Sequence, residues 1–249
     1  MQHTPYLKEH KNSDTIVIFT HGYFGSPNQF DFLTDTLYKA SISVAALLLP
    51  GHGNDNFRKN RLKNWEAYVQ SEIDKHSNKY KNIILVGHSI GGLLSLNASL
   101  KKENNVKGVV LLATPMCVRF PLKGLINSVK ILLLPSKYDN EIRKRYRNGN
   151  SITFVSIFHY PHVLLQLFEI NKLMTKTKSL LPSIAIPVLI VHSEKDETVS
   201  KKSGIRFFDG LINSDRKLIN LKDSVHAFYE LTEQEIIKKE LINFINKIN

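Results

Sequence analysis

The sequence predicts an α/β protein in which helices flank a mostly parallel central sheet. Short, almost entirely apolar runs such as Thr15–Thr20 (TIVIFT) and Val44–Leu49 recur along the chain, and such runs are typical of parallel strands buried on both faces. Segments with helical signals separate these runs, as in βαβ units. A chain of 249 residues is long enough to bury a core of this kind within one domain.

The stretch Asn82–Gly92 carries the most specific pattern in the chain. An apolar run leads directly into Gly-His-Ser-Ile-Gly and then into the helix-forming segment Leu93–Leu100. G-x-S-x-G between a strand and a helix is typical of a sharp turn that exposes a nucleophilic serine. Ser89 is therefore the candidate nucleophile, and the backbone N–H of Ile90 is placed to face a developing oxyanion. The alternative is an ordinary turn with an incidental serine.

The run Thr15–Thr20 ends in the glycine-rich segment HGYFGS. Functional loops lie beyond the carboxyl ends of parallel strands, so this loop can supply a second donor to the same oxyanion. The backbone N–H of Tyr23 is the candidate. Ser26 as N-cap and a proline in the first turn predict a helix from about Pro27 to Tyr38. The alternative is a connecting loop without a chemical role.

The alternation of strands and helices stops after an apolar run that ends at Ala113. Apolar residues at helical spacing continue in Leu122–Leu134 and Phe154–Met174, and a segment of this length must carry its own helices. We interpret residues 117–181 as a helical cap insertion and residues 1–116 and 182–249 as the core domain.

Placed at the carboxyl edge of the sheet, the insertion would cover the site. Phe158 and Phe168 of the insertion are candidate substrate contacts, together with Phe24 and His88 of the core. The alternative for the residues of the insertion is that they only pack it against the core.

The strands predicted at Ile186–His192 and Lys217–Leu221 lead into loops that contain Asp196 and His226. A serine nucleophile needs a histidine base, and the base needs an acid that fixes its tautomer. The order serine, acid, histidine, each on the loop after a separate strand, matches one of the known arrangements of such a triad. Asp223 is the rival acid, but it shares the loop of the base.

A closing amphipathic helix ends the chain. The pattern Thr232-x-x-Glu235 predicts a capping box at its start. The apolar residues that fall on one face of it are Ile237, Leu241, Phe244, Ile245 and Ile248.

The formal net charge of +12 raises the question of nucleic acid or anionic lipid as a partner. The lysines are spread over most of the chain and no nucleic-acid-binding module is present, so we predict no nucleic-acid partner. The basic run Arg143–Arg147 is interpreted as a solvated helix face, with peripheral contact to anionic lipid as the specific alternative. The sequence does not predict the oligomeric state.

A single cysteine, Cys117, excludes a disulfide framework within the chain and favours a reducing compartment. The N-terminal residues are polar and lack the apolar core of a signal peptide. No apolar run is long enough to span a bilayer. These features predict a cytoplasmic protein.

The segments HGYFGS, PGHG, GHSIGG, ATPM, HSEKDETV and VHAF together resemble the α/β-hydrolase family, in particular its small bacterial carboxylesterases and monoacylglycerol lipases. The resemblance implies an α/β-hydrolase fold with a helical cap after the sixth strand. It also implies a triad of Ser89, Asp196 and His226, with Tyr23 and Ile90 as oxyanion donors. Short- to medium-chain acyl esters or monoacylglycerols would be the substrates, and no metal or organic cofactor is required.

One position departs from this pattern, because relatives often have glycine where this chain has Val225, directly before the histidine. A β-branched residue restricts the turn. Within the enzyme class the alternatives are an acyl thioesterase or another acyl hydrolase. From a different class comes a non-catalytic ligand-binding protein that retains the fold.

Overall fold

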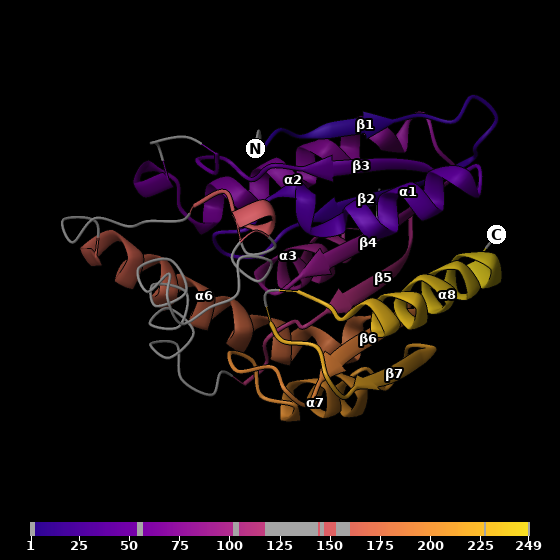
Figure 1. The fold of residues 1–249 in the computed structure, drawn as a ribbon. Coiled ribbons are helices and arrows are strands. Elements are labelled where there is room, and N and C mark those ends of the chain that lie inside the picture. Colours follow the sequence, from indigo (N-terminus) through magenta and orange to yellow (C-terminus); the bar gives the residue numbers. More distant parts are fainter. Residues whose placement is uncertain are drawn as a thin grey trace.

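A twisted sheet of seven strands forms the centre of the part of the chain that is described here (Figure 1). The computed structural model describes residues 3–53, 57–101, 105–117, 144, 147–152, 160–226 and 228–248. The order of the strands is β1-β3-β2-β4-β5-β6-β7, with β1 antiparallel to β3 and the other pairs parallel. The strands are β1 Tyr6–Lys8, β2 Thr15–Thr20, β3 Ser43–Leu47, β4 Asn82–His88, β5 Val106–Leu112, β6 Val188–Ser193 and β7 Arg216–Leu221.

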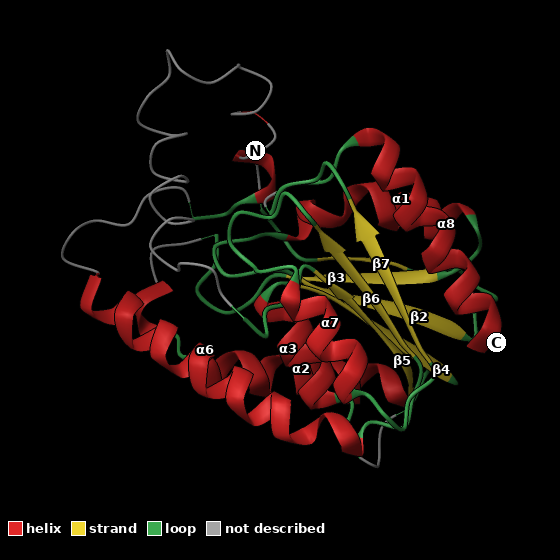
Figure 2. Ribbon diagram, turned by 90° about the horizontal axis from the view of Figure 1, so that it is seen from below, coloured by secondary structure: helices red, strands yellow, loops and turns green. Residues whose placement is uncertain are grey.

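Helices cover both faces of the sheet (Figure 2). On one face lie α1 and α8, and on the other lie α2, α3 and α7, with the long helix α6 packed against α2 and α3. The helices are η1 Pro27–Phe30, α1 Asp31–Lys39, η2 Phe57–Lys59, α2 Leu62–Ser77, α3 Ile90–Ala98, α6 Tyr160–Leu180, η5 Leu181–Ser183, α7 Lys202–Gly210 and α8 Leu231–Ile248.

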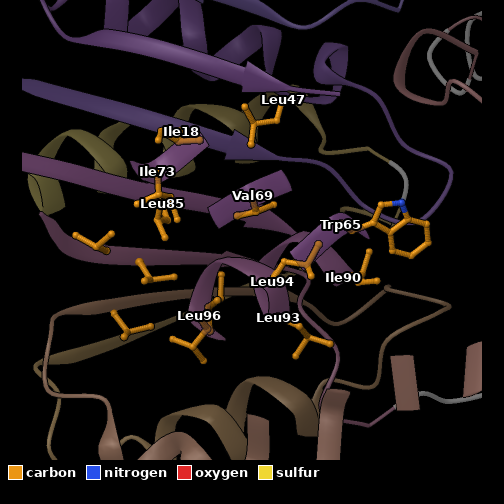
Figure 3. Packing of buried hydrophobic residues seen from close by; sticks show 14 of the residues in the cluster. Ile18, Leu47, Trp65, Val69, Ile73, Leu85, Ile90, Leu93, Leu94 and Leu96 are labelled. Atoms are coloured by element: carbon orange, nitrogen blue, oxygen red, sulfur yellow. The ribbon is translucent and has the colours of Figure 1, made fainter. Parts of the chain in front are cut away.

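Two hydrophobic clusters fill the space between the sheet and its helices. Successive side chains of a strand point to opposite faces, so in β2 Ile16 and Ile18 contact one cluster while Val17 and Phe19 contact the other. Figure 3 shows the first cluster, in which residues of α2 and α3 pack against β2, β3 and β4. Trp65 of α2 is fully buried there. The central strands are apolar on both faces because both faces are covered.

The predicted core elements are confirmed, with differences at two helix starts. Ser26 has extended backbone before η1, but its side chain makes no cap hydrogen bond and instead donates to the carbonyl of Asn148, 3.3 Å away. The predicted capping box at Thr232 is wrong, because α8 already begins at Leu231. Glu233, in the first turn of α8, accepts amides of the preceding loop.

The insertion is described in part. α6 overlaps the predicted helix Phe154–Met174 but continues to Leu180, whereas the predicted helix Leu122–Leu134 lies outside the described residues. The insertion follows β5, so five described strands precede it rather than the six expected from the resemblance. Within the described ranges, no helix is both long and apolar enough to cross a membrane.

Candidate active site

The backbone of the turn between β4 and α3 accounts for the two glycines of the G-x-S-x-G pattern. Ser89 has φ 53° and ψ −123°, a strained conformation for a residue with a side chain. A Cβ atom at Gly91 would lie 2.0 Å from the carbonyl oxygen of Thr20, and one at Gly87 would lie 2.3 Å from the backbone of Gly91. Both positions therefore require glycine. The amide of Gly92 donates to the carbonyl of Ser89 within the turn, and the amide of Ser89 donates to the carbonyl of Leu112 at the end of β5.

The structure brings Ser89, His226 and Asp196 together in one line of hydrogen bonds. Nε2 of His226 lies 3.1 Å from Oγ of Ser89, and Nδ1 lies 2.8 Å from Oδ2 of Asp196. The other carboxylate oxygen of Asp196 accepts the amides of Thr198 (2.9 Å) and Val199 (2.7 Å). An ionised carboxylate is an acceptor only, so Nδ1 carries the proton and the lone pair on Nε2 faces the serine hydroxyl.

The surroundings set the protonation states of this pair. Burial raises the pKa of the Asp196 carboxyl, but His226 and the two amides outweigh burial, so the pKa lies below its ordinary value. Burial lowers the pKa of His226, yet Asp196 and then Glu197 raise it more, and the pKa lies above its ordinary value. A carboxylate and an imidazole held in this way suit a base that accepts a proton during reaction.

Two further side chains fix the backbone of His226. Glu197 accepts the amide of His226 at 3.1 Å, and Nε2–H of His88 donates to its carbonyl at 2.9 Å. The His88 ring is buried beside the His226 ring, and burial followed by the proximity of His226 lowers the pKa of His88 to about 3. His88 is therefore neutral.

The loop of His226 is anchored by Glu233 of α8. The Glu233 carboxylate accepts backbone amides of residues 222–224 and the hydroxyl of Ser224. Val225, the position that departs from the family pattern, is not among the described residues with a positive φ, so a β-branched residue fits this turn. Sequence reasoning missed Glu233, because its role shows only once α8 packs beside the loop.

The loop after β2 lies beside Ser89. A Cβ atom at Gly22 would lie 3.1 Å from Cβ of Ser89, so Tyr23 follows directly beside the turn. Ile90 is the first residue of α3, and the first amides of a helix have no acceptor within the helix. The two predicted donors thus belong to segments that flank Ser89.

The remaining candidates lie in different surroundings. Asp223, the rival acid, forms an ion pair with Lys195 at the surface. Phe24 packs against the ring of Tyr23. Phe168 is 54% exposed, with the ammonium of Lys172 over its ring.

The substrate contacts predicted for Phe24, His88 and Phe168 stay predictions, and Phe158 lies outside the described residues. In the portion of the chain with described coordinates, no group of three or more His, Cys, Asp or Glu residues is arranged to hold a metal ion.

This sheet, with the sharp turn of Ser89 after a central strand, is the α/β-hydrolase fold. A family model described as serine aminopeptidase, S33, matches residues 11–234, and the chain belongs to this family. The family and its relatives place the chain among serine hydrolases of the esterase and lipase type.

Among curated relatives, the thermostable monoacylglycerol lipase of Bacillus sp. (strain H-257) is 22% identical over 239 residues, which cover 95% of this chain and 92% of that protein. Palmitoyl-protein thioesterase ABHD10 of Bos taurus is 22% identical over 246 residues, covering 97% of this chain and 76% of that protein.

Among solved structures, one described under LipS and LipT, two metagenome-derived lipolytic enzymes, has a TM-score of 0.78 at 20% identity and covers 99% of this chain and 98% of that chain. The monoacylglycerol lipase of Paleococcus ferrophilus has a TM-score of 0.71 at 18% identity, with 97% and 99% covered. At these identities the structural likeness shows the fold.

Proposed function

We propose that the chain hydrolyses carboxylic esters, with short- to medium-chain acyl esters or monoacylglycerols as substrates. The observation that carries the proposal is the position of His226 between Ser89 and Asp196, within hydrogen-bonding distance of both. Three side chains from three separate loops meet in the order that proton transfer from a serine requires.

In the proposed reaction, His226 takes the proton of Ser89 as the hydroxyl oxygen attacks the ester carbonyl. The tetrahedral oxyanion is stabilised by the amides of Tyr23 and Ile90. Its collapse breaks the bond to the alcohol, which leaves with the proton from His226, and an acyl-enzyme remains. Water then attacks the acyl group while His226 takes a proton from it. Collapse of this second tetrahedral intermediate breaks the bond to Oγ of Ser89, which takes the proton back from His226, and the acid is released.

The first experiment is labelling with a fluorophosphonate probe, on the wild type and on Ser89→Ala, followed by peptide mapping. We expect modification confined to the peptide of Ser89 and lost in the variant, together with loss of p-nitrophenyl ester hydrolysis. A folded wild-type protein that does not label would remove the proposal and favour a non-catalytic ligand-binding protein.

An acyl thioesterase is the second candidate, because the same triad serves both reactions and a palmitoyl-protein thioesterase is among the relatives. The family is also described by a serine aminopeptidase activity, so peptide hydrolysis is included in the test. Initial rates on p-nitrophenyl esters, monoacylglycerols, acyl-CoA and aminoacyl p-nitroanilides would separate these activities. A preference for acyl-CoA would favour thioester hydrolysis over ester hydrolysis as the activity of this chain.

Peripheral contact with anionic lipid is part of the proposal, supported by α6. This helix exposes Leu164, Leu165 and Phe168, and Lys172 lies beside Phe168, a combination that suits the surface of an anionic membrane. Co-sedimentation with phosphatidylglycerol vesicles but not with phosphatidylcholine vesicles is the expected result. Binding that is independent of salt and of lipid charge would contradict it. A cytoplasmic location stays a prediction drawn from the sequence.

A further inference from the structure

The loop that carries the proposed donor Tyr23 needs support from outside itself. Phe24 has a φ of 68°, in the left-handed region that is strained for a residue with a side chain. Such a conformation persists only where neighbouring groups fix it. On the core side, His21 and Gln29 bind the carbonyl and the amide of Gly22.

The support for the next residues comes from the insertion. The amide of Ser151 donates to the carbonyl of Phe24 at 3.0 Å, and its hydroxyl donates to the carbonyl of Gly25 at 2.6 Å. The side-chain hydroxyl of Tyr23 donates to Oε1 of Gln166 on α6, 2.5 Å away. Two separate parts of the insertion therefore hold three consecutive residues of this loop.

Gln166 is buried completely and its orientation is determined by its partners. Its Nε2 donates to the carbonyls of Phe57 (3.2 Å) and Asn60 (2.7 Å). Because a carbonyl can only accept, the amide group must turn Oε1 toward Tyr23. The single side chain thus joins the loop after β2 to the segment around η2 and to the insertion.

The ring of Tyr23 transmits this contact to its own backbone. It packs against the rings of Phe24, Phe57 and Trp65, with centroids 4.3, 5.4 and 6.0 Å away. Burial raises the pKa of Tyr23, so the hydroxyl keeps its proton and remains a donor to Gln166. A ring held by three neighbouring rings and by the hydrogen bond of its hydroxyl leaves the adjacent peptide little freedom.

We propose that Gln166 is a positioning residue that holds the backbone N–H of Tyr23 at the oxyanion, so that turnover depends on the docking of α6 on the core. The inference rests on the proposed ester hydrolysis. It assigns to the insertion a part in transition-state stabilisation, in addition to covering the site.

The test uses Tyr23→Phe and Gln166→Met, with Glu169→Gln as the matched control. Glu169 lies one turn further along α6 and joins the same helix to Arg61 of the same segment at 2.7 and 2.9 Å, without contacting Tyr23. Measured quantities are kcat and KM for a p-nitrophenyl ester and the inhibition constant of a trifluoromethyl ketone, whose adduct with the serine places an oxyanion where the transition state does.

Complete loss of an oxyanion donor lowers kcat on the order of 100-fold to 1000-fold, and a displaced donor should cost less. We expect kcat to fall about tenfold in each of the two variants, KM to change less than about twofold, and the inhibition constant to rise by the same factor as kcat falls. The double variant should be no less active than the less active of the two single variants, since both substitutions remove the same hydrogen bond between Tyr23 and Gln166.

Three results would overturn the inference. These are an unchanged kcat in Tyr23→Phe, an inhibition constant that does not follow kcat, or an equal loss in Glu169→Gln, which would assign the effect to general docking of the helix. Tyr23→Phe removes one oxygen atom and leaves the apolar ring contacts, so it serves if Gln166→Met does not fold. A wild-type enzyme that fails to hydrolyse esters would refute the proposed function instead, before any variant is compared.

Discussion

Replacing Asp196 by asparagine should invert the hydrogen bonding of the proposed base. The amides of Thr198 and Val199 both donate to one carboxylate oxygen of Asp196, so the oxygen of an asparagine would take that position. Its NH₂ group would then face Nδ1 of His226 and require a lone pair there. The proton would move to Nε2, where it points at Ser89 and cannot be exchanged for the proton of the serine.

The expected loss follows from this change of tautomer. The corresponding substitution in a serine protease triad lowers kcat on the order of 10⁴-fold, and each factor of ten corresponds to about 1.4 kcal/mol of barrier. For Asp196→Asn we therefore expect a loss of about 10³-fold to 10⁴-fold in kcat, or about 4 to 5.5 kcal/mol. KM should change little, because Asp196 is buried behind the base.

The pH profile supplies a second, independent readout. In the proposed mechanism neutral His226 is the active form. Asp196 is a cause of its raised pKa, so wild-type activity should fall on the acid side as the pH drops through that raised value. In Asp196→Asn burial still lowers the pKa while the carboxylate is gone. The acid limb of kcat/KM should therefore move to lower pH.

Asp223→Asn is the matched control, because Asp223 is the rival acid of the same loop and pairs only with Lys195 among the contacts described. It should retain kcat within about twofold, since an exposed ion pair contributes little. Stopped assays with a p-nitrophenyl ester between pH 5 and 9 measure both variants. An Asp196→Asn enzyme within tenfold of the wild type, or with an unshifted acid limb, would refute the assignment of the acid.

Two further predictions concern stability, measured by urea denaturation. Gly91→Ala should lower the free energy of unfolding by about 2 to 4 kcal/mol, because the new methyl group would overlap the backbone of β2; Gly25→Ala, which meets only the side chain of Gln29, should cost less, and equal costs would contradict the packing argument. Glu233→Gln should cost about 1 to 3 kcal/mol at pH 7 through its buried amide contacts, whereas Glu235→Gln at the surface should be neutral. Burial raises the pKa of Glu233, but its hydrogen bonds hold it below the ordinary value. The stabilisation by the Glu233 carboxylate is therefore present above pH 4.5 and is lost as the pH falls through the lowered pKa. A destabilisation by Glu233→Gln that is undiminished at pH 3 would contradict this explanation.

The sequence predicts those parts of the molecule whose signal is local. Strands β2, β4 and β6 are mostly apolar and bounded by turn residues, and the glycines around Ser89 are required by close contacts with the backbone of the turn and of β2. The candidate triad could be named because each member follows a strand, and the ends of parallel strands meet at one edge of the sheet. Strand β1 could not be predicted, since three residues carry too little pattern.

The contacts that hold the site in place are different in kind. Gln166 accepts a hydrogen bond from Tyr23, which lies 143 positions earlier in the sequence. The sequence around a helical glutamine does not show whether its side chain is buried and joins two segments or is exposed to solvent. The partner of His88 could not be predicted either. Its position directly before Ser89 suggests a role beside the serine, but its hydrogen bond is made to the carbonyl of His226. Such partners are set by how α6 and the loop of His226 pack, which periodicity does not encode.

The distance in sequence between Ser89 and His226 has a consequence for folding during synthesis on the ribosome. The serine turn is complete once β2, β4, β5 and α3 are formed, but its histidine lies 137 residues later, after the last strand of the sheet. Under the proposed mechanism, a nascent chain that has folded only its first half has the serine turn without its base. Ser89 would then become reactive only when β6 and β7 have joined the sheet edge, and the time course of probe labelling during refolding would report that final step.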